Sequence, residues 1–192
     1  MYLRYHFTPI IRCFSYMDFS TRHILKLLKL LEQKGYDIDA VAEKCNLNIK
    51  HIIDSKQLPN ANQMNKLWEE AIDITQEQSL GLELGEHYNF MALGLVGQVI
   101  QNAETIENAL EQTMEFSNVL TDLLTIELEK EDQFFRLKFI PNPECFLQYK
   151  TATIQTILTS MMFTLKEYQL LTFQKIKPRR ADFAMKINHH FD

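Results

Sequence analysis

Glycine, proline and cysteine are all scarce in this chain, and each scarcity excludes a class of protein. Five glycines and five prolines among 192 residues are too few for a collagen-like, low-complexity or linker-dominated sequence. The three cysteines, Cys13, Cys45 and Cys145, are odd in number and far apart. This argues against a disulfide framework and for a reducing compartment, so we expect a cytoplasmic protein. The length suits one domain or slightly more.

Long apolar runs are missing as well. No stretch reaches the roughly 18 apolar residues that a membrane-spanning helix needs, and Arg4 and Arg12 interrupt the apolar N-terminal segment. A signal peptide is therefore not expected. The basic, leucine-rich segment 21–34 is typical of a helix that packs its leucines on a core. We expect no membrane partner.

Charge is distributed unevenly along the chain, whose formal net charge is −5. Up to Gly35 there are six basic and two acidic residues, whereas residues 60–119 hold ten acidic residues and one lysine. Such an acidic stretch repels DNA, so strong overall attraction to nucleic acid is not expected.

The first two thirds of the chain predict helices. In segment 21–34, apolar residues recur at helical spacing, with Ser20 as the expected N-cap and Gly35 as the stop. Shorter helices are expected at 37–48 and 49–56. A helix at 63–75 would be capped by Asn60 or Asn62, and another begins at Thr105. Four of the five glycines lie between residues 81 and 97, which favours tight turns or close helix approach.

The period of the apolar pattern then changes from 3.6 to 2, which predicts a β-hairpin over residues 124–139. If the numbers of opposed residues sum to 265, Leu128 faces Leu137 on the buried side. Glu129 then faces Arg136 and Glu127 faces Lys138 on the solvent side, where opposite charges stabilise the pair.

A long helix is expected over residues 145–168, followed by a third strand over 179–187, where apolar and polar residues alternate. We therefore predict an α+β fold. It has a helical N-terminal half, then a β-hairpin, a long helix and a further strand, which form a small antiparallel sheet covered by helices.

Motifs that would carry catalysis or hold a metal are absent from the sequence. There is no C-x-x-C spacing, the histidines are not placed as ligand pairs, and no glycine-rich phosphate loop or nucleophile elbow occurs. We expect neither an enzyme nor a bound metal or cofactor.

The sequence of residues 37–58 is compatible with two roles, core packing and DNA binding. Their apolar positions, Ala42, Leu47 and Ile52, match those of a helix-turn-helix. Three basic residues, Lys50, His51 and Lys56, could meet phosphates. We favour a helical hairpin that packs on the core, because the acidic stretch follows directly; DNA binding by this segment is the alternative.

Four short motifs occur in a characteristic order between residues 67 and 110. They are a Leu-Trp-Glu-x-Ala helix, a Gly-Leu-x-Leu-Gly turn, a Leu-Gly-Leu-x-Gly segment and a Thr-Ile-x-x-Ala-Leu helix start (Leu67–Ala71, Gly81–Gly85, Leu93–Gly97, Thr105–Leu110). Over roughly residues 20–187 the chain resembles the N-terminal effector-binding, arabinose-binding-like domain of AraC-type bacterial transcription regulators, in the ornithine-regulator-like branch.

The resemblance implies a sensor that binds an unknown small-molecule effector and acts on DNA only through a C-terminal helix-turn-helix domain. The expected organisation is an N-terminal extension at 1–19 and a sensor domain at 20–192. The DNA-binding domain is absent from this chain, and the resemblance leaves open whether the sensor is complete at Asp192 and whether it is a homodimer.

We expect the effector between the glycine-rich helices and the sheet or long helix, in a mostly apolar site with few polar anchors. The candidate ligand-binding residues are Tyr88, Phe90, Phe116, Asn118 and Tyr149. The alternative to a sensor is a protein-interaction or dimerisation module without a small-molecule ligand.

Overall fold

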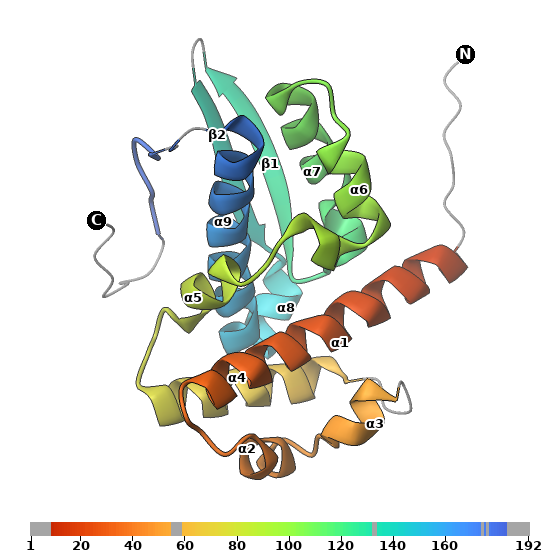
Figure 1. Ribbon diagram of the computed structural model, residues 1–192, viewed down its shortest axis with the longest axis vertical. Coiled ribbons are helices and arrows are strands. Elements are labelled where there is room, and N and C mark those ends of the chain that lie inside the picture. Colours follow the sequence, from red (N-terminus) through yellow and green to blue (C-terminus); the bar gives the residue numbers. More distant parts are fainter. Residues whose placement is uncertain (1–8, 55–58, 132–133, 174, 176, 184–192) are drawn as a thin grey trace.

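The computed structural model describes residues 9–54, 59–131, 134–173, 175 and 177–183, with the backbone alone for residues 9–20, 92, 118 and 119. The elements in chain order are α1 (Pro9–Gln33), α2 (Ile38–Lys44), α3 (Ile49–Ile53), α4 (Ala61–Thr75), α5 (Leu80–Glu86), the 3-10 helix η1 (Phe90–Leu93), α6 (Leu95–Gln101), α7 (Ile106–Leu120), β1 (Leu124–Glu131), β2 (Phe134–Pro141), α8 (Pro143–Gln148) and α9 (Lys150–Thr172). Figure 1 shows α1–α4 as one layer of helices, beside which stands a second layer formed by the hairpin with α7 and α9. The predicted α+β class is confirmed.

Helix α1 is longer than the sequence predicts. It begins at Pro9, so Ser20 lies inside the helix and does not cap it; proline is well suited to the first helical position because its φ is already helical. The end is as expected. Gly35 has φ +89°, and the N–H groups of Gly35 and Tyr36 donate to the carbonyls of Glu32 and Leu31, which is a Schellman cap.

Helices α2 and α3 form the helical hairpin predicted for residues 37–58, of which 55–58 lie outside the described part. Ala42, Leu47 and Ile52 are buried in the core. Asn46 adopts φ +54° in the turn between the helices, a conformation that asparagine tolerates better than most residues. The apolar positions shared with a helix-turn-helix are therefore used for packing against the core.

The single long helix predicted over residues 145–168 is wrong in one respect: it is two helices, which meet at Tyr149 (φ −131°, ψ 52°). A contact remote in sequence holds the start of the second helix. Asn65 of α4 accepts a hydrogen bond from the N–H of Ala152 at 3.0 Å, and so satisfies a free donor in the first turn of α9.

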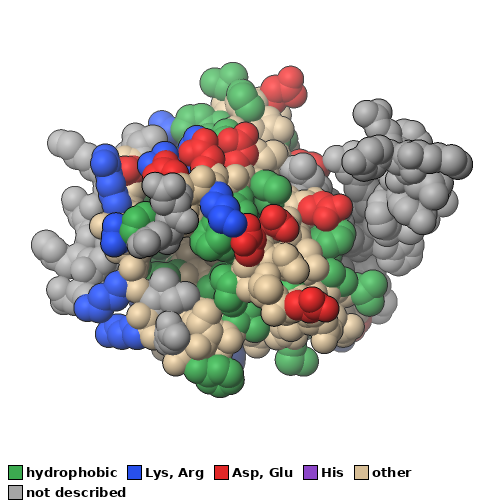
Figure 2. Space-filling model, turned by 90° about the horizontal axis from the view of Figure 1, so that it is seen from above, with side chains coloured by type: hydrophobic (Ala, Val, Ile, Leu, Met, Phe, Trp, Pro, Cys, Tyr) green, Lys and Arg blue, Asp and Glu red, His purple; other side chains and the backbone are tan. Residues whose placement is uncertain are grey.

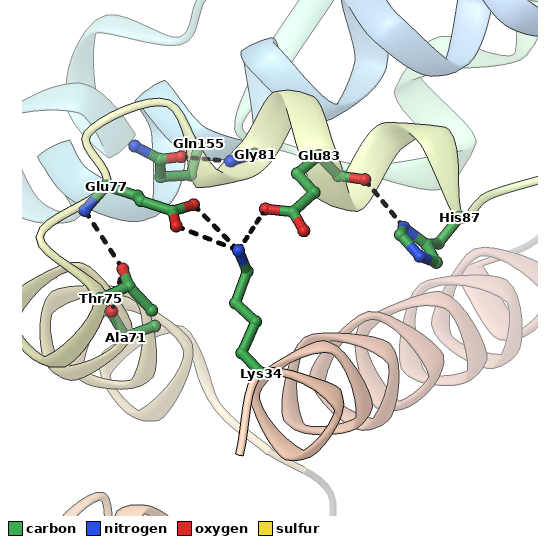
Figure 3. A network of polar contacts seen from close by, with 8 residues as sticks. All are labelled: Lys34, Ala71, Thr75, Glu77, Gly81, Glu83, His87 and Gln155. Carbon is green, nitrogen blue, oxygen red and sulfur yellow. Dashed lines mark hydrogen bonds and ion pairs between the residues drawn. The ribbon is translucent and has the colours of Figure 1, made fainter. Parts of the chain in front are cut away.

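Helix α9 is enclosed by α4, α5, α7, α8 and the hairpin. Helix α5 approaches it most closely, because Gly81 and Gly85, four residues apart, face the backbone of α9. The approach is fixed by Gln155, whose Oε1 accepts a hydrogen bond from the N–H of Gly81 at 2.7 Å (Figure 3). Gly81 and Gly85 thus serve close helix approach, one of the two roles that the sequence leaves open. The Gly-Leu-x-Leu-Gly motif, expected as a turn, lies inside helix α5.

The last turn of α1 is tied to the same region by an ion-pair network (Figure 3). Lys34 Nζ lies 3.0 Å from a carboxylate oxygen of Glu77 and 2.8 Å from one of Glu83. The ring of His87 in turn contacts the carbonyl of Glu83 at 2.9 Å. Helix α5 is therefore held on one side by α9 and on the other by α1.

The hairpin has the predicted register. Leu128 faces Leu137, and Glu129 faces Arg136; Leu128 and Leu137 pack against the core. On the solvent side Arg136 pairs with Glu129 and Glu131, and Lys138 pairs diagonally with Glu129.

The further strand is not found where the structure describes it. Residues 179–183 contain no strand, and 184–187 lie outside the described residues. The guanidinium carbon of Arg179 lies 3.6 Å from the centroid of the Phe134 ring. This segment therefore meets the hairpin by side-chain stacking, and the sheet that the structure describes has two strands.

In the described part of the chain, no helix is long and apolar enough to cross a membrane.

Candidate functional site

A cavity of about 70 Å³ lies where the two layers meet. Its walls come from the start of α4, the junction between α7 and β1, and the junction between α8 and α9, and one residue of α1 completes it. The lining residues are His23, Pro59, Asn60, Ala61, Met64, Thr121, Leu123, Tyr149, Ala152 and Thr156. This volume is well below the roughly 300 Å³ at which pockets for drug-sized ligands begin. As it stands, the cavity accommodates a small molecule or one end of a larger one.

The first wall is set by the cap of α4. Asn60 and Gln63 form a capping box, in which each side chain accepts a hydrogen bond from the other residue's N–H. Gln63 also donates to the carbonyl of Asn46 at 2.6 Å. The start of α4 is thereby fixed to the α2–α3 turn.

The second wall is the start of α9, which carries Tyr149, Ala152 and Thr156. The bond from Ala152 to Asn65 joins this wall to α4, and Thr153 donates back to the carbonyl of Tyr149 at 2.8 Å. The starts of α4 and α9 are thus both held by side-chain hydrogen bonds within the domain.

The third wall is the turn that leads from α7 into β1. The hydroxyl of Thr121 accepts a hydrogen bond from the N–H of Leu123 at 3.1 Å. The carbonyl of Leu123 accepts one from the N–H of Asn142 at 2.9 Å. This wall is therefore joined to the start of β1 and to the end of β2.

The remaining side is closed by His23, a buried residue of α1. Its Nδ1 lies 2.7 Å from the hydroxyl of Tyr88, and its ring centroid lies 5.6 Å from that of Trp68. Burial, with a smaller contribution from Lys26, lowers the pKa of His23 to about 4. Burial likewise raises the pKa of Tyr88. Both side chains are neutral at pH 7.

The five residues predicted to bind ligand are not brought together. Tyr149 lines the cavity, and Tyr88 reaches it only through its contact with His23. Phe90 packs edge-on against Phe163, with ring centroids 5.4 Å apart. Phe116 is half-buried on α7, and the side chain of Asn118 lies outside the described part.

Most of the lining was not predicted from the sequence. Thr121, Leu123 and Ala152 carry no motif, and His23 stands alone in the sequence. One signal was available: the apolar run that forms α9 contains several threonines and a glutamine, and Thr156 of the cavity is one of them. Polar residues in an apolar helix often mark a contact that the periodicity does not explain.

Among the described residues, no three His, Cys, Asp or Glu side chains lie close enough together to hold a metal ion. The described residues that line the cavity include one histidine and none of the other three types.

The family model described as the arabinose-binding domain of AraC transcription regulators, N-terminal, matches residues 35–190. This chain belongs to that family. A domain of this AraC family is a ligand-sensing regulatory domain. No curated protein matches the chain.

Membership of the AraC family agrees with the motif order on which the resemblance was based. The structure gives the Gly-Leu-x-Leu-Gly motif a physical role, because its two glycines are the contact points of α5 on α9. Its two leucines, Leu82 and Leu84, are buried.

Proposed function

We propose that this domain senses a small-molecule effector that enters the cavity between α1, α4, α9 and the α7–β1 turn. The observation that carries the proposal is the position of the cavity. Its lining draws on both layers of the fold, so an occupant contacts each of them at once.

An effector would act by shifting the balance between two arrangements of these layers. A ligand larger than the present cavity must part the walls, and the α7–β1 wall is bonded to Asn142 at the end of the hairpin. We propose that this displacement reaches a separate helix-turn-helix domain, through which the full regulator contacts DNA. The effector-binding cavity and the DNA-binding domain are then two sites that are coupled allosterically.

The test is a thermal-shift screen with amino acids, polyamines, sugars and fatty acids. A ligand at 100 times its Kd stabilises the folded state by roughly 2.7 kcal/mol, which raises the melting temperature measurably. The chain's one tryptophan, Trp68, lies beside His23 of the cavity, so its fluorescence emission is a second readout.

The location is tested by filling the cavity. Ala152→Leu places additional methyl groups in the lining and should abolish the shift produced by the effector. Ala40→Leu, on the exposed side of α2, is the matched control and should respond like the wild type. An effector that stabilises Ala152→Leu as strongly as the wild type would show that the cavity is not its site.

A second candidate function, a protein-interaction or dimerisation module, is favoured by one group of exposed apolar side chains. Met91 and Leu95 are 76% and 78% exposed, and Val99 follows one turn after Leu95 on α6. The other exposed apolar residues of the described part are less exposed or lie on other elements, namely α3, β2, α8 and the end of α9. Figure 2 shows apolar side chains scattered among charged ones on the face that it presents. Light scattering at increasing concentration tests this alternative: a stable dimer that Leu95→Ser dissociates, without any effector found in the screen, would favour it.

A further inference from the structure

The walls of the cavity also carry information about the chemistry of its occupant. We propose that the cavity receives an uncharged, mainly apolar group, either a small neutral molecule or the aliphatic end of a larger effector. This inference rests on the proposed function, because it concerns the same cavity.

The first observation is the composition of the lining. Among the described residues that line the cavity there is no Asp, Glu, Lys or Arg. Burying an ion without a partner of opposite charge costs several kcal/mol even after the protein relaxes. Neither a carboxylate nor an ammonium group finds such a partner in this lining.

The second observation concerns the helix starts at the cavity. The starts of α4 and α9 both contribute to its walls, and free N–H groups at such a position commonly bind anions. Here the capping box of Asn60 and Gln63 takes up the N–H of each partner, and Asn65 takes up that of Ala152. These side chains therefore leave fewer free N–H groups at the two helix starts to bind an anion.

The third observation is the state of His23, which among the described lining residues is the one that could carry a positive charge near neutral pH. It is buried, bonded to Tyr88 and neutral at pH 7. It therefore supplies no positive charge to pair with an anion. Its ring, packed beside Trp68, is an uncharged part of the lining.

Apart from the amide of Asn60, which caps α4, what remains is a small number of hydroxyl groups among methyl and methylene groups. Thr121, Tyr149 and Thr156 supply the hydroxyls, and the apolar part comes from Met64, Leu123 and the two alanines. The hydroxyl of Thr121 already accepts a bond from Leu123. The lining thus provides for one or two hydrogen bonds to a short alcohol, carbonyl or ester, within an otherwise apolar contact.

Three probes of equal chain length test the assignment at pH 7.5: butan-1-ol, butyrate and butylammonium. Their binding is measured by the change in melting temperature and in Trp68 fluorescence emission. Wild type, Ala152→Leu and the surface control Ala40→Leu are compared. We expect butan-1-ol to bind the wild type and Ala40→Leu at least tenfold more tightly than either ion, and to lose this binding in Ala152→Leu.

The outcomes separate the inference from the function on which it rests. Binding of butyrate or butylammonium as tight as that of the alcohol, and lost in Ala152→Leu, would overturn the uncharged class and leave the cavity as a ligand site. Absence of binding by the alcohol would also overturn it. If an effector from the screen binds Ala152→Leu unchanged, the proposed function itself fails.

Discussion

Substitution of Gly85 by alanine is the sharpest test of how α5 lies on α9. A Cβ at this position would lie 2.6 Å from the carbonyl oxygen of Thr159 and 2.8 Å from Cβ of Met162. Because the first of these is a backbone atom, no side-chain rotation relieves the contact. The two helices must separate by about 0.8 Å to reach ordinary contact distance, and a gap of that size forfeits a quarter to a half of each dispersion contact that it opens.

The magnitude follows from two opposed effects. Overpacking of a core costs about 1–3 kcal/mol, and a contact with a backbone atom that cannot rotate away belongs in the upper half of that range, at about 2–3 kcal/mol. Alanine, on the other hand, is intrinsically favoured over glycine inside a helix by about 1 kcal/mol. We therefore expect Gly85→Ala to lower the free energy of unfolding by about 1–2 kcal/mol. For a domain of this size that corresponds to a fall in melting temperature of about 2–8 °C.

The assay is thermal unfolding followed by circular dichroism, with Glu86→Ala as the control. Glu86 is the next residue of α5 and is exposed, so its replacement should change stability by less than about 0.5 kcal/mol. A Gly85→Ala variant that melts at or above the wild-type temperature would refute the close packing of α5 on α9.

Three further predictions concern buried and charged groups. His23 has a pKa of about 4 in the folded state against 6.5 when unfolded; its contribution to stability is complete above pH 6.5 and is lost as the pH falls toward 4. Urea unfolding should therefore show that the free energy of unfolding falls by about 2 kcal/mol from pH 7 to pH 5. This fall should be absent in His23→Asn and retained in His51→Asn. Asn65→Ala leaves the N–H of Ala152 without its acceptor and should cost about 1–3 kcal/mol, measured by urea unfolding against the exposed control Asn62→Ala. Glu129→Gln should lower the melting temperature more than Glu127→Gln, because Glu129 pairs with both Arg136 and Lys138; 1 M NaCl should remove the difference.

The parts of the fold that could be predicted from the sequence are those determined by neighbouring residues. The hairpin register follows from its own alternation of apolar and charged residues, and the caps at Gly35 and Asn60 follow from local backbone chemistry. By contrast, the first turn of α9, which follows the helix break at Tyr149, is bonded to Asn65, far away in the chain. The alternation at residues 179–183 fits a strand but cannot show whether a strand edge is free to pair.

The same distinction explains the candidate site. Aromatic residues are reasonable candidates by type, yet Phe90 packs on Phe163. Of the four candidates whose side chains the structure describes, only Tyr149 lines the cavity. The cavity arises where four separate segments meet. Ala152 and Leu123 belong to it by position alone, a property that no local pattern carries.

The central claim is that an effector occupies the cavity between α1, α4, α9 and the α7–β1 turn. The most direct measurement is a titration of the chain, labelled with ¹³C at its methionine methyl groups, with the effector found in the screen. Met64 lines the cavity, whereas Met91 is 76% exposed on η1. The account predicts that the Met64 resonance shifts in proportion to occupancy while that of Met91 stays in place. A saturating effector that moves Met91 and leaves Met64 unchanged would contradict it.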